Sequence, residues 1–464
     1  MRLKQSKFLP AVFLFALLSI AACGGNTTEY DDYTLTEAAD VYETPEDIAE
    51  TPEPEEIGEE SEAAQPEEAA TEEPHIETAI PRSHHYYEEL LARSRLWEEV
   101  AYAERNNPDR IAEMENRSIQ YGDVHMDFVY FVIGTKPPEG RALYIALHGG
   151  GGVPAAVNDQ QFAHMQSYYR WSVTEGIYVA VRGVRDTWDT HFNPESFPIY
   201  DRLIENMILF YGVDPNRVYL MGFSAGGDGV YAITPRMADR FAAVSMSAGH
   251  HNWVNPINFK HTPIILQCGD SDFAFYRHIE TVNFGEKLRD LGYTFVLNMH
   301  VNMPHNFSDN VGAPQQVWED PFAWRDGYES EIIEIDTNAV RFLEQHTRNP
   351  LPDNLAWYLA TRAPYRAVRS FYWLRACHDL NSGTIWASFD SMTNSVNIET
   401  DRVEGAFYVL LNRQMVDFDK PVILYVNGVV TEMWVESDMD ILVETTLERM
   451  DPNFQFTAVI RVEV

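Results

Sequence analysis

The chain alternates between short apolar runs and longer amphipathic segments from residue 128 to residue 348. Helix-compatible stretches occupy 160–172, 200–211, 281–291 and 336–348. The apolar runs that read as buried strands are 128–133, 143–147, 178–181, 218–221, 242–246, 264–267 and 295–299. Strands that alternate with helices form a mainly parallel sheet with helices on both faces. We therefore predict an α/β fold whose ligands bind beyond the carboxyl ends of the strands.

The sequence Asn-Pro-Leu-Pro at 349–352 marks a boundary after which this pattern changes. Asn427-Gly428 stands between two apolar runs and predicts a hairpin turn. No helix-forming stretch of useful length interrupts the β-rich runs, which are 370–375, 384–389, 395–398, 406–411, 422–426, 429–435 and 456–464. We predict an α/β domain over 81–348, followed by an all-β, sandwich-like domain over 351–464.

The first 23 residues have the pattern of a targeting segment. Three cations precede the apolar run 8–20, which is too short to favour a membrane-spanning helix. Ile20-Ala21-Ala22-Cys23 resembles a bacterial lipobox, which implies cleavage before Cys23 and lipidation of its thiol. The alternative is an ordinary secretory signal cut near Ala22. We expect a protein anchored by lipid to the extracytoplasmic face of the cell membrane.

Residues 24–80 contain twenty Asp and Glu, five Pro and no Lys or Arg, which predicts a disordered acidic linker. The formal net charge of the whole chain is −37, and the chain stays acidic without the linker. This balance argues against nucleic-acid partners. The three cysteines form no disulfide or metal-binding pattern, and we expect neither a metal nor a cofactor. A helix over 86–105 is expected to pack on the α/β domain as an N-terminal extension.

The pentapeptide Gly222-Phe223-Ser224-Ala225-Gly226 follows the apolar run 218–221 and precedes a helix-compatible segment. A G-x-S-x-G sequence between strand and helix is typical of a nucleophile elbow, a sharp turn that exposes the serine hydroxyl. Glycines flank the serine because a Cβ would clash there. Alone the motif also arises by chance, so its weight comes from three neighbouring features. It makes Ser224 the candidate nucleophile.

A glycine run from Gly149 to Gly152 follows the strand 143–147 and His148. The N–H group of Gly150 or Gly151, together with that of Ala225, would form an oxyanion hole. The alternative is a flexible turn. We expect His148 and Trp188 to line the substrate pocket, with Trp188 as its aromatic wall. The alternative for the loop that contains Trp188 is a surface loop held by an Arg–Asp pair.

Acid and base candidates follow the next strands. Asp270 and Asp272 come after the run 264–267, and Asp272 is favoured because Asp270 can serve as a turn cap. His305 lies in the loop after the run 295–299, where its imidazole can reach Ser224, whereas His300 reads as a packed or surface histidine. The chain order is then Ser, Asp, His.

With these residues in place, residues 119–347 resemble the α/β-hydrolases. They are most similar to the branch of secreted polyhydroxybutyrate depolymerases, feruloyl esterases and predicted peptidases. Residues 213–227 and 239–244 carry the resemblance, and the G-x-x-D pattern at 269–272 supports Asp272. The resemblance implies a serine hydrolase that cleaves small or polymeric carboxylic esters through an acyl-enzyme. A peptidase of the same fold and a surface binding protein without catalysis are the alternatives.

Two further groups of residues are candidates for a role in binding. His250 and His251 are adjacent, but no third ligand has recognisable spacing, which favours loop histidines over a metal site. The aromatic residues of the β-rich part are expected in its core rather than on a sugar-binding platform. They are Trp357, Tyr358, Tyr372, Trp373, Trp386 and Trp434.

Overall fold

The computed structural model describes residues 83–252, 254–359 and 369–464. Residues Thr78–Val464 form one compact unit. The predicted signal segment, the lipid-attachment site at Cys23 and the acidic linker lie outside the described residues. The described helices include none that is both long enough and apolar enough to cross a bilayer.

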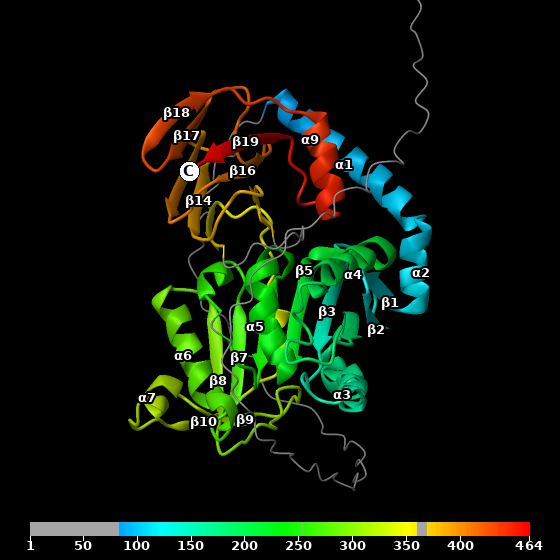
Figure 1. Cartoon of the computed structure of the whole chain (residues 1–464), viewed down its shortest axis with the longest axis vertical. Helices are drawn as coiled ribbons and strands as arrows, with labels where there is room; N and C mark the ends of the chain where they lie inside the picture. The colour runs from blue at the N-terminus through cyan, green and yellow to red at the C-terminus, as the bar shows by residue number, and fades with distance from the viewer. Residues whose placement is uncertain (1–82, 253, 360–368) are drawn as a thin grey trace, which may run out of the picture. The chain divides into compact units, whose positions relative to one another are not determined.

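Ten strands form one mixed sheet in the order β1-β2-β4-β3-β5-β6-β7-β8-β9-β10 (Figure 1). The strands from β4 to β8 in this order pair in parallel, and antiparallel strands flank them on both sides. Their bounds are β1 Ser118–Tyr121, β2 Val124–Ile133, β3 Arg141–Leu147, β4 Gly176–Val181, β5 Val213–Phe223, β6 Ala243–Ser247, β7 Ile264–Gly269, β8 Phe295–His300, β9 Gln315–Trp318 and β10 Ile332–Ile335. The seven predicted runs coincide with β2 to β8, which confirms the α/β fold class.

Helices cover both faces of this sheet and bury it. Successive residues of β3 point alternately to the two layers, Leu143 and Ile145 to the first, Tyr144 and Ala146 to the second. Strands buried on both faces read as continuous apolar runs, which is why the sequence showed them clearly. The first layer holds α4 Ser196–Tyr211, α5 Ala225–Met237 and α6 Arg277–Asp290, and the second holds α3 Ala155–Tyr168 and α8 Ala339–Leu343.

The helix expected over 336–348 is much shorter in the structure. Only α8 is helical, and Asn338 caps it by accepting the N–H group of Val340 at 3.0 Å. Beyond α8 the chain carries Arg348 into a buried contact, where its Nη2 lies 2.8 Å from the carboxylate of Asp451. This ion pair joins residues 103 positions apart, so the local sequence gives no sign of it.

Two antiparallel-rich sheets with a shared apolar core follow residue 353. Asn427 and Gly428, with φ of 49° and 82°, form the predicted hairpin turn between β17 Val422–Val426 and β18 Val429–Met433. One sheet has the order β11 Asn354–Tyr358, β14 Thr384–Asp390, β15 Ser395–Asp401, β17 Val422–Val426 and β18 Val429–Met433. The other has the order β12 Ser370–Phe371, β13 Leu374–Ala376, β16 Ala406–Leu411 and β19 Ala458–Glu463.

A helix does interrupt this β-rich part, contrary to expectation: α9 spans Met439–Arg449. Its N-cap Asp438 accepts the N–H group of Asp440 at 2.8 Å. Leu442 is fully buried, so tertiary packing fixes a helix whose Val, Ile and Thr content favours strands. The domain boundary at 348–351 stays a prediction, because Thr78–Val464 hold together as one unit.

The N-terminal helix α1, His84–Arg105, contacts both parts of the molecule rather than the α/β part alone (Figure 1). Buried Glu89 accepts the N–H group of Arg413 at 2.9 Å and the hydroxyl of Thr457 at 2.6 Å. Further along the helix, Ala101 packs with Leu209 of α4. The helix α2, Pro108–Asn116, then leads into β1.

The β-rich part meets the α/β part at the amino ends of the parallel strands. Arg240 stands three residues before β6. Its Nε lies 2.7 Å from Asp201, and its Nη1 lies 3.7 Å from Asp451. Arg449 lies 2.6 Å from Asp239. With Arg348 these residues form a buried cluster of three arginines and three aspartates, called here the interface ion cluster. The cluster lies at the edge of the sheet opposite the carboxyl ends of the strands.

Candidate active site

Ser224 stands in a sharp turn at the carboxyl end of β5. The strand ends at Phe223, α5 begins at Ala225, and Ser224 has φ 60° and ψ −121°, a conformation that few residues other than glycine adopt. A Cβ on Gly222 would lie 2.2 Å from the carbonyl oxygen of Gly226. The flanking glycines are therefore required by close packing, as a nucleophile elbow demands.

Ser224, His305 and Asp272 form one chain of hydrogen bonds. Oγ of Ser224 lies 2.9 Å from Nε2 of His305, and Nδ1 of the same ring lies 2.7 Å from Oδ2 of Asp272. The Asp272 side chain is 1% exposed, whereas that of His305 is 31% exposed. The acid is thus buried, whereas the imidazole that it bonds remains partly exposed.

The competing acid and histidine take other roles. Oδ2 of Asp270 accepts the indole N–H group of Trp318 at 3.0 Å, and its Oδ1 accepts the Ser271 hydroxyl. His300 is buried, stacks on Phe307 and shares a hydrogen bond with Gln267. Burial lowers the pKa of His300 to about 4. Asp270 and His300 are therefore packing residues.

The glycine loop after β3 lies against the serine. A Cβ on Gly149 would be 3.3 Å from Cβ of Ser224. The expectation that Gly151 is an oxyanion donor is wrong, because its N–H group donates to Oδ1 of Asn158 at 2.8 Å. Within the described part of the chain, the N–H groups of Gly150 and Ala225 have no acceptor in the protein. They remain the candidate oxyanion donors.

His148 does not line the pocket as expected. Its side chain has no exposed surface, Nε2 accepts the N–H group of Gly183 at 3.1 Å, and Nδ1 donates to the carbonyl oxygen of Gly149. Burial lowers the pKa of His148 to about 4, so the ring is neutral at physiological pH. The imidazole stabilises the start of the glycine loop, because both ring nitrogens form hydrogen bonds with backbone groups.

Trp188 is 60% exposed, and its ring packs edge-on against Phe192. Its backbone N lies 3.4 Å from the position of a Cβ on Gly152, so the residue stands beside the glycine loop. This placement suits the role of an aromatic pocket wall, which stays a prediction.

Sequence reasoning missed Asp309, a buried carboxylate four residues beyond His305. It accepts hydroxyl hydrogen bonds from Tyr168 at 2.9 Å, from Tyr169 at 2.8 Å and from Ser247. Burial raises the pKa of Asp309. The backbone carbonyl of Ser247 in turn accepts the N–H group of Ser224 at 2.9 Å, so Asp309 ties the histidine loop to the strand beside the elbow.

The adjacent histidines have protein partners. His250 hydrogen-bonds Asn252, and Nε2 of His251 lies 2.7 Å from Glu280. Throughout the residues that the structure describes, no three His, Cys, Asp or Glu side chains are grouped to hold a metal ion. Of the C-terminal aromatics, Trp373 is fully buried, whereas Trp386 and Trp434 are 40% and 70% exposed. The expectation of core positions is therefore wrong for these two residues.

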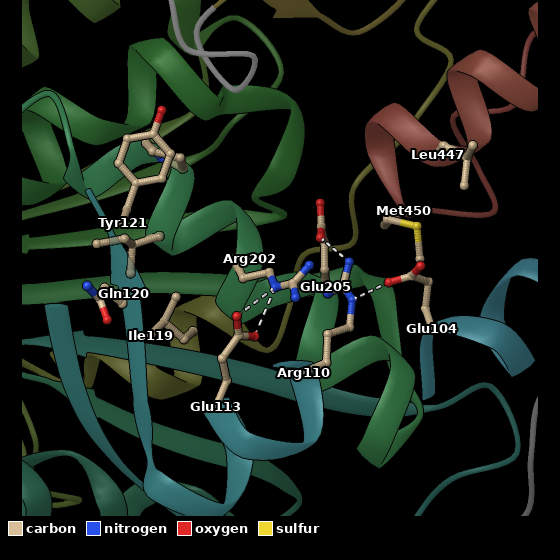
Figure 2. A pocket seen from close by; sticks show the side chains of 12 residues that line it. Glu104, Arg110, Glu113, Ile119, Gln120, Tyr121, Arg202, Glu205, Leu447 and Met450 are labelled. Atoms are coloured by element: carbon tan, nitrogen blue, oxygen red, sulfur yellow. Dashed lines mark hydrogen bonds and ion pairs between the residues drawn. The ribbon is translucent and has the colours of Figure 1, made fainter. Parts of the chain in front are cut away.

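A cavity of about 380 Å³ lies elsewhere, among α1, α2, β1, α4 and α9 (Figure 2). Arg110 lies 2.7 Å from Glu104 and 2.8 Å from Glu205, and Arg202 lies 2.9 Å from Glu113. These ion pairs satisfy the charges that line the cavity, and none of the candidate catalytic residues reaches it. We interpret it as a structural cleft.

Comparison with known proteins adds distant likenesses only. No protein-family model matches the chain, and no curated protein matches it either. The structure is similar to a thermostable esterase, with 19% identity and a TM-score of 0.36 over 50% of this chain and 62% of that one. It is also similar to esterase PE8, with 21% identity and a TM-score of 0.31 over 40% and 94% of the two chains.

An acylaminoacyl peptidase of Pyrococcus horikoshii matches at 17% identity and a TM-score of 0.31, over 41% of this chain and 37% of that one. The matched part thus spans less than two thirds of the thermostable esterase and of the peptidase. These likenesses are too distant to indicate an activity. The strand order, the helices on both faces and the elbow after β5 show that the chain has the α/β-hydrolase fold.

Proposed function

We propose that this protein is a serine hydrolase that cleaves carboxylic esters through an acyl-enzyme. The observation that carries the proposal is the hydrogen-bond chain Ser224–His305–Asp272 at a nucleophile elbow. A serine hydroxyl is a weak nucleophile until a neighbouring base takes its proton. The short distances from Ser224 to His305 and from His305 to Asp272 support the proposal, because acyl transfer needs a base beside the hydroxyl and an acid behind the base.

In the first half of the reaction, Nε2 of His305 accepts the hydroxyl proton while Oγ of Ser224 attacks the acyl carbon. The carbonyl oxygen becomes an oxyanion, which the N–H groups of Ala225 and Gly150 stabilise. The imidazolium then donates its proton to the leaving alcohol, and the acyl group stays on Ser224. Asp272 holds the histidine tautomer and stabilises the imidazolium. In the second half, water attacks the acyl-enzyme by the same steps.

The substrate class is tested by turnover of a panel of p-nitrophenyl, feruloyl, acetyl-sugar and oligomeric hydroxyacid esters, with p-nitroanilides as the peptidase alternative. We expect ester cleavage that Ser224→Ala abolishes without loss of fold. Ser167→Ala is the matched control, because its hydroxyl donates only to the carbonyl oxygen of His164 on α3. A folded Ser224→Ala protein with wild-type ester turnover would contradict the proposal. Cleavage of anilides in preference to esters would favour a peptidase.

We also propose that the protein is anchored by lipid at Cys23 on the extracytoplasmic side of the membrane. The lipobox and the acidic linker of the sequence support this location. Mass spectrometry of the native N-terminal peptide tests it. Lipid on Cys23 is expected, and a soluble protein with an unmodified N-terminal peptide would contradict the anchor.

A further inference from the structure

The backbone between Asp272 and α6 contains two neighbouring outliers. Phe275 has φ 54° and ψ 19°, and Tyr276 has φ 57° and ψ 28°. The left-handed region is unfavourable for a bulky residue, because its Cβ approaches the following carbonyl oxygen. Both side chains are exposed, at 63% and 72%, so burial of their rings does not explain the conformation. Strain of this kind persists where the surrounding structure requires it, often at functional sites.

The tight turn brings the first residue of α6 back onto the candidate catalytic acid. Nη1 of Arg277 lies 3.5 Å from Oδ1 of Asp272, and its guanidinium stacks over the ring of Phe275 at 4.8 Å. The other carboxylate oxygen, Oδ2, faces His305. Among the described residues, Arg277 is the charged residue that forms an ion pair with Oδ1. The two oxygens of Asp272 therefore have different partners.

Other groups around this contact have partners of their own. Nδ1 of His278 bonds the backbone carbonyl of Asp272 at 3.0 Å, and the Cys268 thiol lies 4.0 Å from Oδ2. Asp228 of α5 feels the charge of Arg277, although burial is the larger effect and raises the pKa of Asp228. Glu280, one turn along α6, pairs with His251. Within the described ranges, Arg277 is thus the arginine that pairs with the acid, and its side chain is only 12% exposed.

We propose that Arg277 is a positioning residue, which holds the Asp272 carboxylate with Oδ2 directed at His305. This inference rests on the proposed function. Arg277 acts through Asp272 and makes no contact with substrate. An ion pair on Oδ1 resists rotation of the carboxylate, which would break the bond to Nδ1.

The test is to measure kcat and KM of full-length Arg277→Met and Arg277→Lys on p-nitrophenyl acetate across the pH range in which histidine titrates. We expect Arg277→Met to lower kcat about tenfold with little change in KM. Because the variant lacks the guanidinium charge beside Asp272, the acid limb of its kcat/KM should move to higher pH. Arg277→Lys keeps the charge and should keep the acid limb in place. Its kcat should still fall, by less than in Arg277→Met, because an ammonium lacks the planar guanidinium geometry.

A double-mutant cycle separates positioning from general structural support. In the Asp272→Asn background, Arg277→Met should have almost no further effect, because the carboxylate it holds is gone. Phe275→Ala, which removes an exposed ring, should weaken the hold on Arg277 and lower kcat in the same direction by a smaller factor. Arg289→Met is the matched control on the same helix. The Arg289 side chain is 49% exposed, and its substitution should leave kcat and KM unchanged.

Two results would overturn the inference. One is an Arg277→Met protein with wild-type kcat and an unshifted acid limb. If Arg277→Met does not fold, the corresponding result is wild-type kcat in both Phe275→Ala and Arg277→Lys. The other is an equal loss from Arg277→Met with and without Asp272. Either result leaves the proposed hydrolase intact, since that proposal is tested separately through Ser224→Ala.

Discussion

The two edges of the ten-stranded sheet use polar residues in opposite ways. At the carboxyl ends of the strands, Ser224 and His305 are accessible, and within the described residues the N–H groups of Ala225 and Gly150 have no protein acceptor. At the amino ends, the interface ion cluster buries three arginines against three aspartates. Catalysis requires polar groups that are still available to a substrate, whereas docking two parts of a chain requires charges that are already paired.

This contrast also explains why the β-rich part has no expected share in bond cleavage. Its contacts with the α/β part, such as Arg348 with Asp451 and Asn258 with Tyr358, lie at the amino ends of β5, β6 and β7. Ser224 follows the carboxyl end of β5, on the far edge of the same sheet. Substitutions at the two edges should therefore have separable effects, on turnover at one edge and on stability at the other.

The largest effect is expected at the catalytic edge, from Asp272→Asn. The amide cannot hold the histidine in the required tautomer, so kcat should fall about a thousandfold or more. Asp270→Asn is the matched control, because that carboxylate bonds Trp318 and Ser271 instead of histidine. Steady-state kinetics on a small ester checks the ranking. A larger loss from Asp270→Asn would move the acid to the other strand-end position.

At the opposite edge, Asp451→Asn should lower the free energy of unfolding by about 3–5 kcal/mol. In the wild type, the Asp451 carboxylate lies 2.8 Å from the buried guanidinium of Arg348 and 3.7 Å from that of Arg240. The substitution removes this negative charge from both. Urea unfolding measures the loss, and kcat/KM of the folded protein should be unchanged. Glu463→Gln, at an exposed pair with Arg461, should cost less than about 1 kcal/mol. Loss of turnover in folded Asp451→Asn would break the separation of the two edges.

A smaller effect on turnover is expected from Gly150→Ala. Gly150 has φ 102°, and a Cβ there would lie 2.3 Å from Oδ1 of Asn158. The displaced loop should weaken the oxyanion contact and lower kcat about ten- to a hundredfold, with little change in KM. Gly152→Ala is the control, because its nearest neighbour would be 3.4 Å away. Equal kinetics of the two variants would remove Gly150 from the oxyanion hole.

The smallest effect is a pH dependence of stability. Burial lowers the pKa of His148 and of His300 to about 4, below the value of about 6.5 for an unfolded histidine. The unfolded state therefore binds more protons between these values, so the stability from each neutral ring is complete above pH 6.5 and falls as the pH drops towards 4. Each histidine should account for about 1–3 kcal/mol. Urea unfolding of His300→Gln should show a weaker pH dependence than wild type, and an identical slope would contradict this.

The parts of the fold and site that could be predicted are those encoded locally. Strands buried on both faces are continuous apolar runs, and parallel strands bring their carboxyl ends to one edge, which placed Ser224, Asp272 and His305 together. Residues that depend on tertiary pairing gave no signal. Asn158 occupies the N–H group of Gly151, and Arg277 reaches Asp272 only through a left-handed turn. The helix α9 escaped notice because packing overrides its β-forming composition.

The claim that Ser224 is the nucleophile is tested most directly by covalent labelling with diethyl p-nitrophenyl phosphate. Oγ would attack phosphorus, p-nitrophenolate would leave, and the diethylphosphoryl group would remain on the serine. Intact-protein and peptide mass spectrometry should find one such group, on the peptide that contains Ser224, together with loss of ester turnover. Ser224→Ala should stay unlabelled. A label on another residue, or full ester turnover by the fully labelled protein, would contradict the account.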